Sequence, residues 1–403
     1  MSEISCETTQ HIDRIALHPI FGLPIFFAIM LLTFTLTFEV AKPFTGIINW
    51  LLGEAAVVLA DVLNSYGAPE LAVSLIRDGF FGGVGSVLVF LPNIAILLFL
   101  VNFLEESGYT ARTAVLMNRF MKTMGLPGKA FIPMAIGLGC NVPAIMATRS
   151  LKNPGERLLT ILLIPLMSCS ARLTVYVLFV SAFFSSNQSA IIFLLYLIGI
   201  AMAIIMGKIF SGFIIKKTYM PTSVELPHYR IPLLKSLIKH AGGSCRHFIS
   251  KAGTVIFLVV VVIWFFASFP FGVEYASQQS TIGRIGTILE PVFAPLGFGN
   301  YKASVSLIFG IIAKETIVGT IGALNGVEGA GIIDAVQSSF TPLSAFSFMV
   351  ITLLYTPCIP ALSVIRKETN SWKWPLFAAV YTFILAWCAA FLVYQTGLFL
   401  GFG

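Results

Sequence analysis

The sequence predicts an all-α polytopic membrane protein with about 8–10 membrane-embedded helical segments. Hydrophobic residues make up 57% of the 403 residues, charged residues make up 11%, and the mean hydropathy is +0.91. A soluble fold needs roughly 25% charged residues to cover its surface, so this chain lacks the polar groups to face water. Apolar runs of about 20 residues, the length that crosses a bilayer core, recur along the chain. The same composition excludes a disordered or fibrous protein.

Most of the expected helices are uninterrupted apolar runs. The stretch 45–65 is apolar but carries Glu54 and Asp61, so it either spans the bilayer or lies in the interface. Two more stretches, 130–148 and 343–365, are interrupted by proline and glycine, which favours broken or re-entrant helices. The uninterrupted runs that are long enough to span are 20–41, 84–104, 157–184, 189–215, 252–271, 301–324 and 375–400.

The placement of Lys and Arg between these runs predicts the orientation of the chain. Segment 216–251 holds seven basic residues against one acid, and 105–129 holds four basic residues, whereas 39–78 holds five acids and two basic residues. The positive-inside rule then places the first two segments in the cytoplasm and the third outside. We therefore expect a multi-pass protein of the cell (inner) membrane with a cytoplasmic N-terminus. The broken segment 343–365 leaves the side of the C-terminus open.

These features predict two membrane halves joined by a linker. The expected parts are a short cytoplasmic N-terminal segment at 1–18, a first membrane half at 19–215, a basic cytoplasmic linker at 216–251 and a second membrane half at 252–403. The interrupted segment of the first half, from Cys140 to Arg149, shows a weak similarity to that of the second half, from Cys358 to Arg366. Paired interrupted segments indicate the binding site of a transporter.

The first candidate site is the interrupted segment around Cys140. Two glycines and two prolines within eleven residues forbid a regular helix through it. Irregular backbone at membrane depth is tolerated only where it is buried in protein or borders a wet cavity. Cys140 and Asn141 would there offer a thiol, an amide and carbonyls to a divalent cation. The alternative is a tight helix crossing in which Cys140 packs as a small apolar residue.

A second candidate lies 29 residues further on, at the start of the next run. Ser168 and Cys169 are followed by Arg172 in an otherwise apolar stretch. A charge at the centre of a membrane helix costs about 2.5–3.5 kcal/mol on insertion scales, so Arg172 should face a cavity or a partner. The alternative for Arg172 is snorkelling towards the interface.

The second half contributes two further candidates. Lys314 and Glu315 lie inside the apolar run 301–324, and Cys358 lies in the broken sequence 355–360. An ionisable residue in a membrane segment indicates a functional site. Lys314 and Glu315 could pair with each other, but adjacent helix positions point in different directions, which favours separate partners.

The sequence contains no motif for binding a nucleotide or a nucleic acid. The nearest string to a phosphate-binding loop, Gly125–Lys129, has neither the required spacing nor the Ser or Thr that holds magnesium. We therefore expect no GTP site, no nucleic-acid partner and no enzymatic activity in this chain.

Several ordered motifs resemble the membrane region of the ferrous iron transporter family FeoB. The resemblance runs from about Asp13 to Trp374. It includes the family's entry to its first membrane helix, its acidic-Ser-Gly-Tyr-x-Ala-Arg block, and its first and second gate motifs. These blocks are 13–24, 105–112, 131–133, 139–149, 168–172, 313–315, 357–358 and 367–374.

The resemblance implies two gate-type halves and Fe²⁺ as the transported substrate. It implies that Cys140, Cys169 and Cys358 lie along the ion path. We expect Cys140 and Cys358 to be the inner metal ligands, assisted by Cys169, Asn141 and Ser168. Charge along the path would be tuned by Lys314, Glu315 and Arg172, and the cytoplasmic exit would contain Glu105, Tyr109 and Arg112.

The resemblance also implies partners. The family carries an N-terminal GTPase domain, whereas 12 residues precede Asp13 here. We therefore expect control by a GTPase on a separate chain, or a paralogue without nucleotide control. A small Feo accessory protein, a homo-oligomer and the lipid bilayer are the other expected partners.

Two alternatives remain at this point. One is a transporter of another divalent metal, or of a nucleoside-like solute, through the same gate fold. The cysteines argue against a nucleoside, which is recognised by amides, hydroxyls and aromatic rings. The other is a regulatory membrane subunit without transport of its own, which the interrupted segments disfavour.

Overall fold

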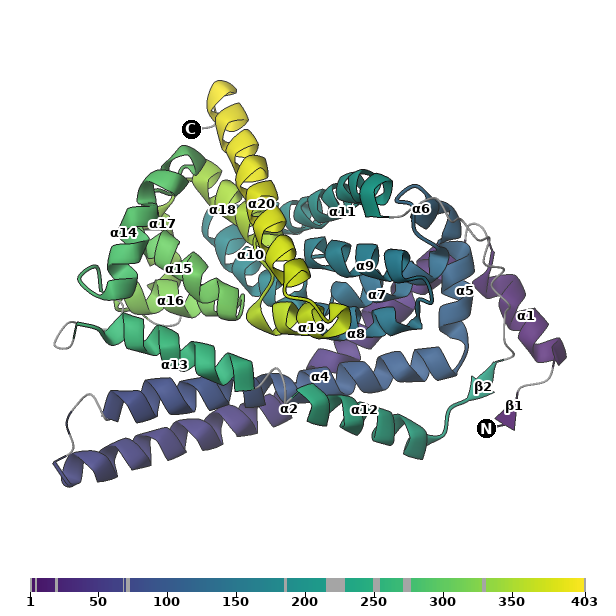
Figure 1. Ribbon diagram of the computed structural model, residues 1–403, viewed down its shortest axis with the longest axis horizontal. Helices are drawn as coiled ribbons and strands as arrows, with labels where there is room; N and C mark the ends of the chain where they lie inside the picture. The colour runs from purple at the N-terminus through teal and green to yellow at the C-terminus, as the bar shows by residue number, and fades with distance from the viewer. Residues whose placement is uncertain are drawn as a thin grey trace. The chain divides into compact units, whose positions relative to one another are not determined.

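A computed structural model of the chain describes residues 2–3, 6–18, 21–67, 69, 73–184, 187–214, 229–248, 254–270, 277–327 and 331–401. These residues are almost entirely helical, which confirms the predicted all-α class (Figure 1). The exception is one short antiparallel pair, in which strand β1 (Ser2–Glu3) pairs with strand β2 (Arg230–Ile231). Part of the predicted basic linker, residues 216–228 and 249–251, lies outside the described residues.

The first part of the chain contains long helices followed by several short ones. Its long helices are α2 (Gly22–Ser65) and α4 (Gly82–Glu106), and a π-helical turn (Leu75–Phe81) precedes α4. The shorter helices are α1 (Cys6–Ala16), α5 (Tyr109–Leu116), α6 (Asn118–Lys122), α7 (Phe131–Gly137), α8 (Asn141–Ala147) and α9 (Pro154–Leu163).

The rest of the chain alternates long apolar helices with broken ones. The helices are α10 (Ser170–Phe183), α11 (Gln188–Ile214), α12 (Leu234–Phe248), α13 (Thr254–Ser268), α14 (Thr281–Phe293), α15 (Tyr301–Ile312), α16 (Thr316–Asn325), α17 (Gly331–Ser339), α18 (Pro342–Leu354), α19 (Ile359–Thr369) and α20 (Lys373–Phe399).

Within the described ranges, 5 helical stretches are long and apolar enough to cross a membrane, or up to 6 if a bent pair is counted as one span. The bent pair joins 91–106 of α4 to α5 at an angle of 79°. Three shorter apolar helices, within α13, α15 and α16, add to these. The five stretches are Gly22–Ser65, Pro154–Phe183, Gln188–Phe213, Pro342–Thr369 and Lys373–Phe399.

The structure differs from the sequence prediction at α2. Two segments, 20–41 and 45–65, were expected, but one helix of 44 residues passes through Pro43. A proline removes one backbone hydrogen bond and can bend a helix without ending it, because neighbouring turns remain bonded. At 1.5 Å per residue this helix is about 66 Å long, roughly twice the thickness of a bilayer core.

The chain forms two compact units, each built from three segments. Unit 1 contains Met1–Ala55, Val84–Ile164 and Ala203–Thr254. Unit 2 contains Ala56–Gly83, Pro165–Met202 and Val255–Gly403. The linear division into membrane halves at 19–215 and 252–403 stays a prediction about how the chain crosses the bilayer.

Burial separates outer helices from inner ones. In the most apolar stretch of α11 22% of residues are buried, and in that of α20 28% are, against 67% for the broken spans Pro154–Phe183 and Pro342–Thr369. Apolar helices that expose most of their side chains require an apolar surrounding, which identifies α11 and α20 as lipid-facing. The broken spans are therefore the interior ones.

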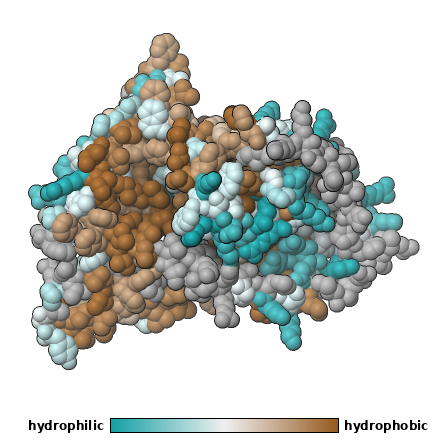
Figure 2. All heavy atoms as spheres, viewed as in Figure 1, coloured by the Kyte–Doolittle hydropathy of each residue, from teal (hydrophilic) through white to brown (hydrophobic). Residues whose placement is uncertain are grey.

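The interior of unit 2 is built around aromatic side chains. Phe348 of α18 stacks on Phe179 of α10 with ring centroids 4.9 Å apart, and it meets Phe298 and Phe340 edge to face. Helix α18 also packs on α20, and α14 packs on α15. Figure 2 shows hydrophobic residues gathered over α14–α16 and hydrophilic ones around α19. This core holds the ends of the broken helices in place.

Candidate functional site

In the described part of the chain, four interruptions of apolar segments end at a residue with a thiol or a carboxylate. Cys140 precedes α8, Cys169 precedes α10, Glu315 precedes α16, and Cys358 precedes α19. All four therefore stand at the N-terminus of a helix, where unpaired N–H groups and the helix dipole create positive potential. The break before α16 was not predicted, because the run 301–324 is continuously apolar around Lys314 and Glu315.

The break in unit 1 presents Cys140 and Asn141 beside helix α2. Gly139 lies so close to Phe34 that a Cβ atom there would be 2.4 Å from the Phe34 ring. Asn141 is 5% exposed, and its Oδ1 atom is buried without a hydrogen-bond partner in the structure. The predicted pair of thiol and amide is therefore present at one point, with an acceptor oxygen available for a ligand.

In unit 2, Lys314 joins the break before α16 to the break before α19. Its ammonium donates a hydrogen bond to the Thr356 carbonyl at 2.6 Å and lies 3.1 Å from the centre of the Tyr355 ring. Lys314 is 3% exposed, so the charge is held in the interior by a carbonyl and an aromatic face. The adjacent Glu315 does not pair with it in the structure, because the bonds of Lys314 go to residues 355 and 356.

Arg172 fixes the third break of unit 2. Its Nη1 atom donates to the carbonyls of Pro165 at 3.1 Å and Met167 at 2.8 Å, which closes the segment before Cys169 over the first turn of α10. Arg172 is 1% exposed, and its Nε and Nη2 atoms are buried without a partner in the structure. The Ser168 hydroxyl donates to Tyr176 Oη at 3.2 Å. Arg172 is thus an interior residue and does not snorkel.

These three breaks form one group, which we call the unit 2 break cluster. Lys314 interacts electrostatically with Arg172, Cys169, Cys358 and Glu315. The elements agree with this grouping, since α10 contacts α16 and α15 contacts α19. The cluster consists of Ser168, Cys169, Arg172, Lys314, Glu315 and Cys358.

The cluster brings together six of the predicted site residues, whereas Cys140 and Asn141 belong to unit 1. Two tyrosines were missed by the sequence reasoning. Tyr176 accepts a hydrogen bond from Ser168, and the ring face of Tyr355 contacts the amino group of Lys314. Tyr355 begins the broken sequence 355–360, which was a signal for it, whereas Tyr176 lies in a regular helix and had none.

The side chains of the described residues include no group of three or more His, Cys, Asp or Glu that could hold a metal ion. Cys140, Cys169 and Cys358 are not joined in disulfides within the described residues, and each is of intermediate exposure. Any cation at these breaks would therefore be held by one or two thiols together with hydroxyl, amide and carbonyl oxygens. Such a set suits an ion that must leave again better than a permanently bound one.

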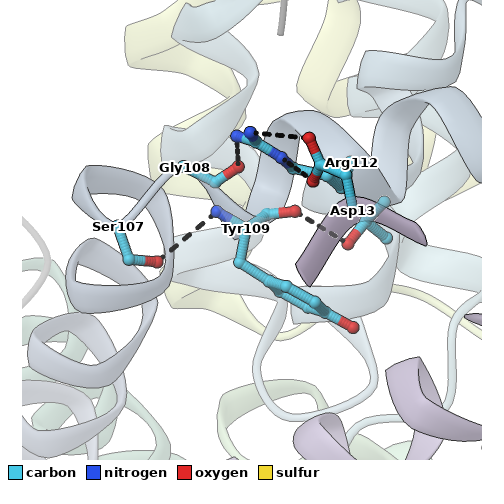
Figure 3. Close-up of polar contacts among 6 residues, drawn as sticks. Asp13, Ser107, Gly108, Tyr109 and Arg112 are labelled. Carbon is cyan, nitrogen blue, oxygen red and sulfur yellow. Dashed lines mark hydrogen bonds and ion pairs between the residues drawn. The ribbon is translucent and has the colours of Figure 1, made fainter. Parts of the chain in front are cut away.

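Two of the predicted exit residues, Tyr109 and Arg112, lie at the bend between α4 and α5 in unit 1 (Figure 3). The buried Arg112 donates from Nε to Asp13 Oδ1 at 2.8 Å and from Nη2 to Asp13 Oδ2 at 3.2 Å. Its Nη1 donates to the Gly108 carbonyl at 2.9 Å, and Gly108 has a left-handed backbone with φ of 87°. The Tyr109 N–H donates to Ser107 Oγ at 3.4 Å. Arg112 is therefore a buried ion-pair residue that ties α1 to the bend.

Tyr229 covers the other side of Arg112. The guanidinium carbon lies 4.0 Å from the centre of the Tyr229 ring. Burial raises the pKa of Tyr229 above its ordinary value, with Arg112 opposing the shift and Asp13 adding to it. Tyr229 thus stays a neutral phenol at physiological pH. Glu105 is exposed beside this group, and its place at an exit remains a prediction.

The close packing behind the unit 2 break cluster leads to a testable expectation at Gly310. A Cβ atom there would be 2.2 Å from Tyr355 Oη and 2.6 Å from Ile317 Cγ1. We expect Gly310→Ala to destabilise the protein by about 1–3 kcal/mol through overpacking, as measured by thermal unfolding in detergent. Gly319→Ala is the control, because nothing lies within 4 Å of a Cβ at that position. Equal stability of the two variants would contradict the close contact at Tyr355.

The fold and the broken interior helices define a polytopic helical membrane protein with interrupted interior spans. The sequence pattern of the gate family, described as nucleoside recognition, matches residues 87–183 and 249–372. A second pattern, described as the ferrous iron transport protein B C terminus, matches residues 192–242. The chain belongs to the gate family and, within it, is a relative of the membrane part of the FeoB proteins.

Several curated proteins resemble the chain over nearly its whole length. An Fe(2+) transporter FeoB of Staphylococcus aureus (strain MSSA476) is 44% identical over 392 residues, which are 96% of this chain and 59% of that protein. An Fe(2+) transporter FeoB of Methanocaldococcus jannaschii is 39% identical over 401 residues, or 97% of this chain and 59% of that protein. The chain thus spans about three fifths of the length of these relatives. No solved structure gives a significant match.

One relative joins two proteins in a single chain. It is the Fe(2+) transport protein A/Fe(2+) transporter FeoB fusion protein of Porphyromonas gingivalis, 36% identical over 442 residues, or 97% of this chain and 52% of that protein.

Proposed function

We propose that this chain is the permease of a FeoB-type uptake system and that its substrate is the ferrous ion. The observation that carries the proposal is the placement of Cys140, Cys169 and Cys358 at the starts of helices in broken segments, in a chain related to Fe(2+) transporters. Iron(II) accepts nitrogen, oxygen and thiolate ligands, so thiols beside free carbonyls suit it.

The residues divide into two groups of ligands. In unit 2, Cys169 and Cys358 would bind the ion with help from Ser168, and in unit 1 Cys140 and Asn141 would do so. Lys314, Glu315 and Arg172 would set the charge along the path. Tyr109, Arg112 and Glu105 would lie at the cytoplasmic exit. A small number of ligands at each step allows the ion to be released.

The proposal extends to location and partners. The basic segments 105–129 and 216–251 support a cytoplasmic N-terminus in the inner membrane. We propose that a FeoB-type GTPase domain gates the permease and that the permease assembles as a homo-oligomer. The fusion of a transport protein A with a FeoB transporter in one relative supports a small Feo accessory protein as a further partner.

The test is anaerobic uptake of iron(II) into liposomes that contain the purified chain. Cys140→Ser and Cys358→Ser are each expected to lower the initial rate about tenfold, because a hydroxyl is a weaker ligand than a thiolate for iron(II). Cys388→Ser is the matched control, because Cys388 is a free, exposed cysteine of α20 away from the breaks.

Parallel assays with zinc(II), manganese(II) and a nucleoside identify the cargo. Faster uptake of any of these than of iron(II) would overturn ferrous iron as the substrate. Full iron uptake by both serine variants would overturn the ligand assignment. If the chain alone shows no uptake, uptake on addition of a FeoB-type GTPase domain would support gating by such a domain.

A further inference from the structure

The unit 2 break cluster buries two basic side chains. Arg172 is 1% exposed and Lys314 is 3% exposed. Among the groups that interact electrostatically with Lys314, Glu315 is the one carboxylate, and the others are Arg172 and the thiols Cys169 and Cys358. The Oε1 atom of Glu315 is itself buried without a hydrogen-bond partner among the described residues, so no direct contact through this atom neutralises Arg172. A buried guanidinium without a negatively charged partner is expensive in a protein interior.

The hydrogen bonds of Arg172 also leave part of its guanidinium without an acceptor. A guanidinium has five N–H donors and no acceptor. Nη1 is fixed by the carbonyls of Pro165 and Met167, so the side chain cannot swing away. The Nε and Nη2 atoms are buried, and no acceptor in the described part of the chain meets them. Unpaired buried donors of a charged group cost more than neutral ones, so an acceptor of negative charge is expected there.

The backbone adds to this field. Arg172 lies in the first turn of α10, a helix of 14 residues, and its own unpaired donors therefore lie at a helix N-terminus. The N-terminus of α19, a helix of 11 residues, belongs to the same cluster through Cys358. Helix N-termini present N–H groups and a partial positive charge to anions.

We propose that the unit 2 break cluster binds a small monovalent inorganic anion, with chloride or bicarbonate chemistry, on the Nε and Nη2 atoms of Arg172. The anion balances the charge of Arg172. It also offsets the charge of a divalent cation that passes the thiols Cys169 and Cys358. Binding does not require iron to be the cargo, so it can be tested without transport.

The experiment measures thermal unfolding of the full chain in detergent, without metal, as chloride replaces gluconate at constant ionic strength. An anion that binds only the folded state raises the unfolding midpoint with a saturating dependence, here by about 3 °C. A parallel series with bicarbonate shows which source of the anion binds more tightly. A midpoint that is the same in chloride, bicarbonate and gluconate would overturn the proposal.

Variants locate the site. Arg172→Gln is expected to abolish the chloride-dependent shift, whereas Arg284→Gln, at an exposed position of α14, should retain it. An unchanged shift in Arg172→Gln would overturn the assignment. Arg172 is buried, and its replacement could prevent folding. Broadening of the ³⁵Cl resonance by the wild-type protein, reversed by bromide, therefore provides a second measurement, and its absence would also count against the site.

Discussion

Asp13→Ala is expected to destabilise unit 1 by about 2–3 kcal/mol, because it leaves the buried Arg112 without its carboxylate. Removing one partner of a buried ion pair typically costs 3–5 kcal/mol, and the 20% exposure of the Asp13 side chain lowers this value by letting water reach the vacated position. The Gly108 carbonyl and the Tyr229 ring remain but carry no negative charge. Thermal unfolding in detergent measures the loss.

A matched control for Asp13 is Glu39→Ala. Glu39 pairs with Lys42 on α2, and the two side chains are 60% and 66% exposed. Exposed ion pairs contribute about 0.2–1 kcal/mol, so this variant should unfold close to the wild type. If Asp13→Ala is no less stable than Glu39→Ala, Arg112 does not depend on its carboxylate partner.

Lys314→Met is expected to lower iron(II) uptake about a hundredfold, by releasing the break that carries Cys358. The substitution keeps an apolar side chain of similar length but removes the hydrogen bond to the Thr356 carbonyl and the contact with Tyr355. A buried cation–π contact contributes about 2 kcal/mol and an unsatisfied buried carbonyl costs about 1–3 kcal/mol. The interaction energy that holds the segment 355–358 in place therefore falls by roughly 3 kcal/mol. Initial uptake rates over a range of iron concentrations measure the effect.

A readout other than transport separates positioning from general damage. The rate at which a maleimide alkylates Cys358 should rise in Lys314→Met, because the segment 355–358 is no longer fixed. Lys302→Met is the control: Lys302 donates to Asn325 Oδ1 at 2.6 Å and lies on α15 outside the cluster. Wild-type uptake and alkylation in Lys314→Met would contradict the role assigned to Lys314.

The class of the protein and the breaks at Cys140 and Cys358 follow from local sequence, whereas the run 157–184, which contains the break at Cys169, was expected to be uninterrupted. A composition with few charged residues shows that the surface of the chain must face lipid. Closely spaced glycine and proline around Cys140 prevent a regular helix. The break before α16 could not be predicted in the same way, since nothing near Lys314 disfavours a helix. It depends on the bond from Lys314 to Thr356, 42 residues away.

Long-range pairing also limited the prediction of the exit residues. Arg112 was predicted as a functional residue, but its partner Asp13 lies 99 residues earlier. Both residues belong to motifs recognised in the sequence, yet a single sequence does not reveal which charged groups meet. The continuity of α2 through Pro43 is a further case, because the decision between bending and ending a helix depends on what packs around it.

The bend between α4 and α5 also has a mechanical consequence. Two separate stretches of chain are attached to it: α1 through the Asp13–Arg112–Gly108 contacts, and β2 through the bond from the Arg230 N–H to the Ser107 carbonyl at 3.3 Å. Strand β1 links these stretches, since it pairs with β2. A displacement of the chain at β1 or at β2 would therefore act on the same two peptide units, those of Ser107 and Gly108. Because α4 turns into α5 at this bend, the angle between the two helices depends on both attached stretches.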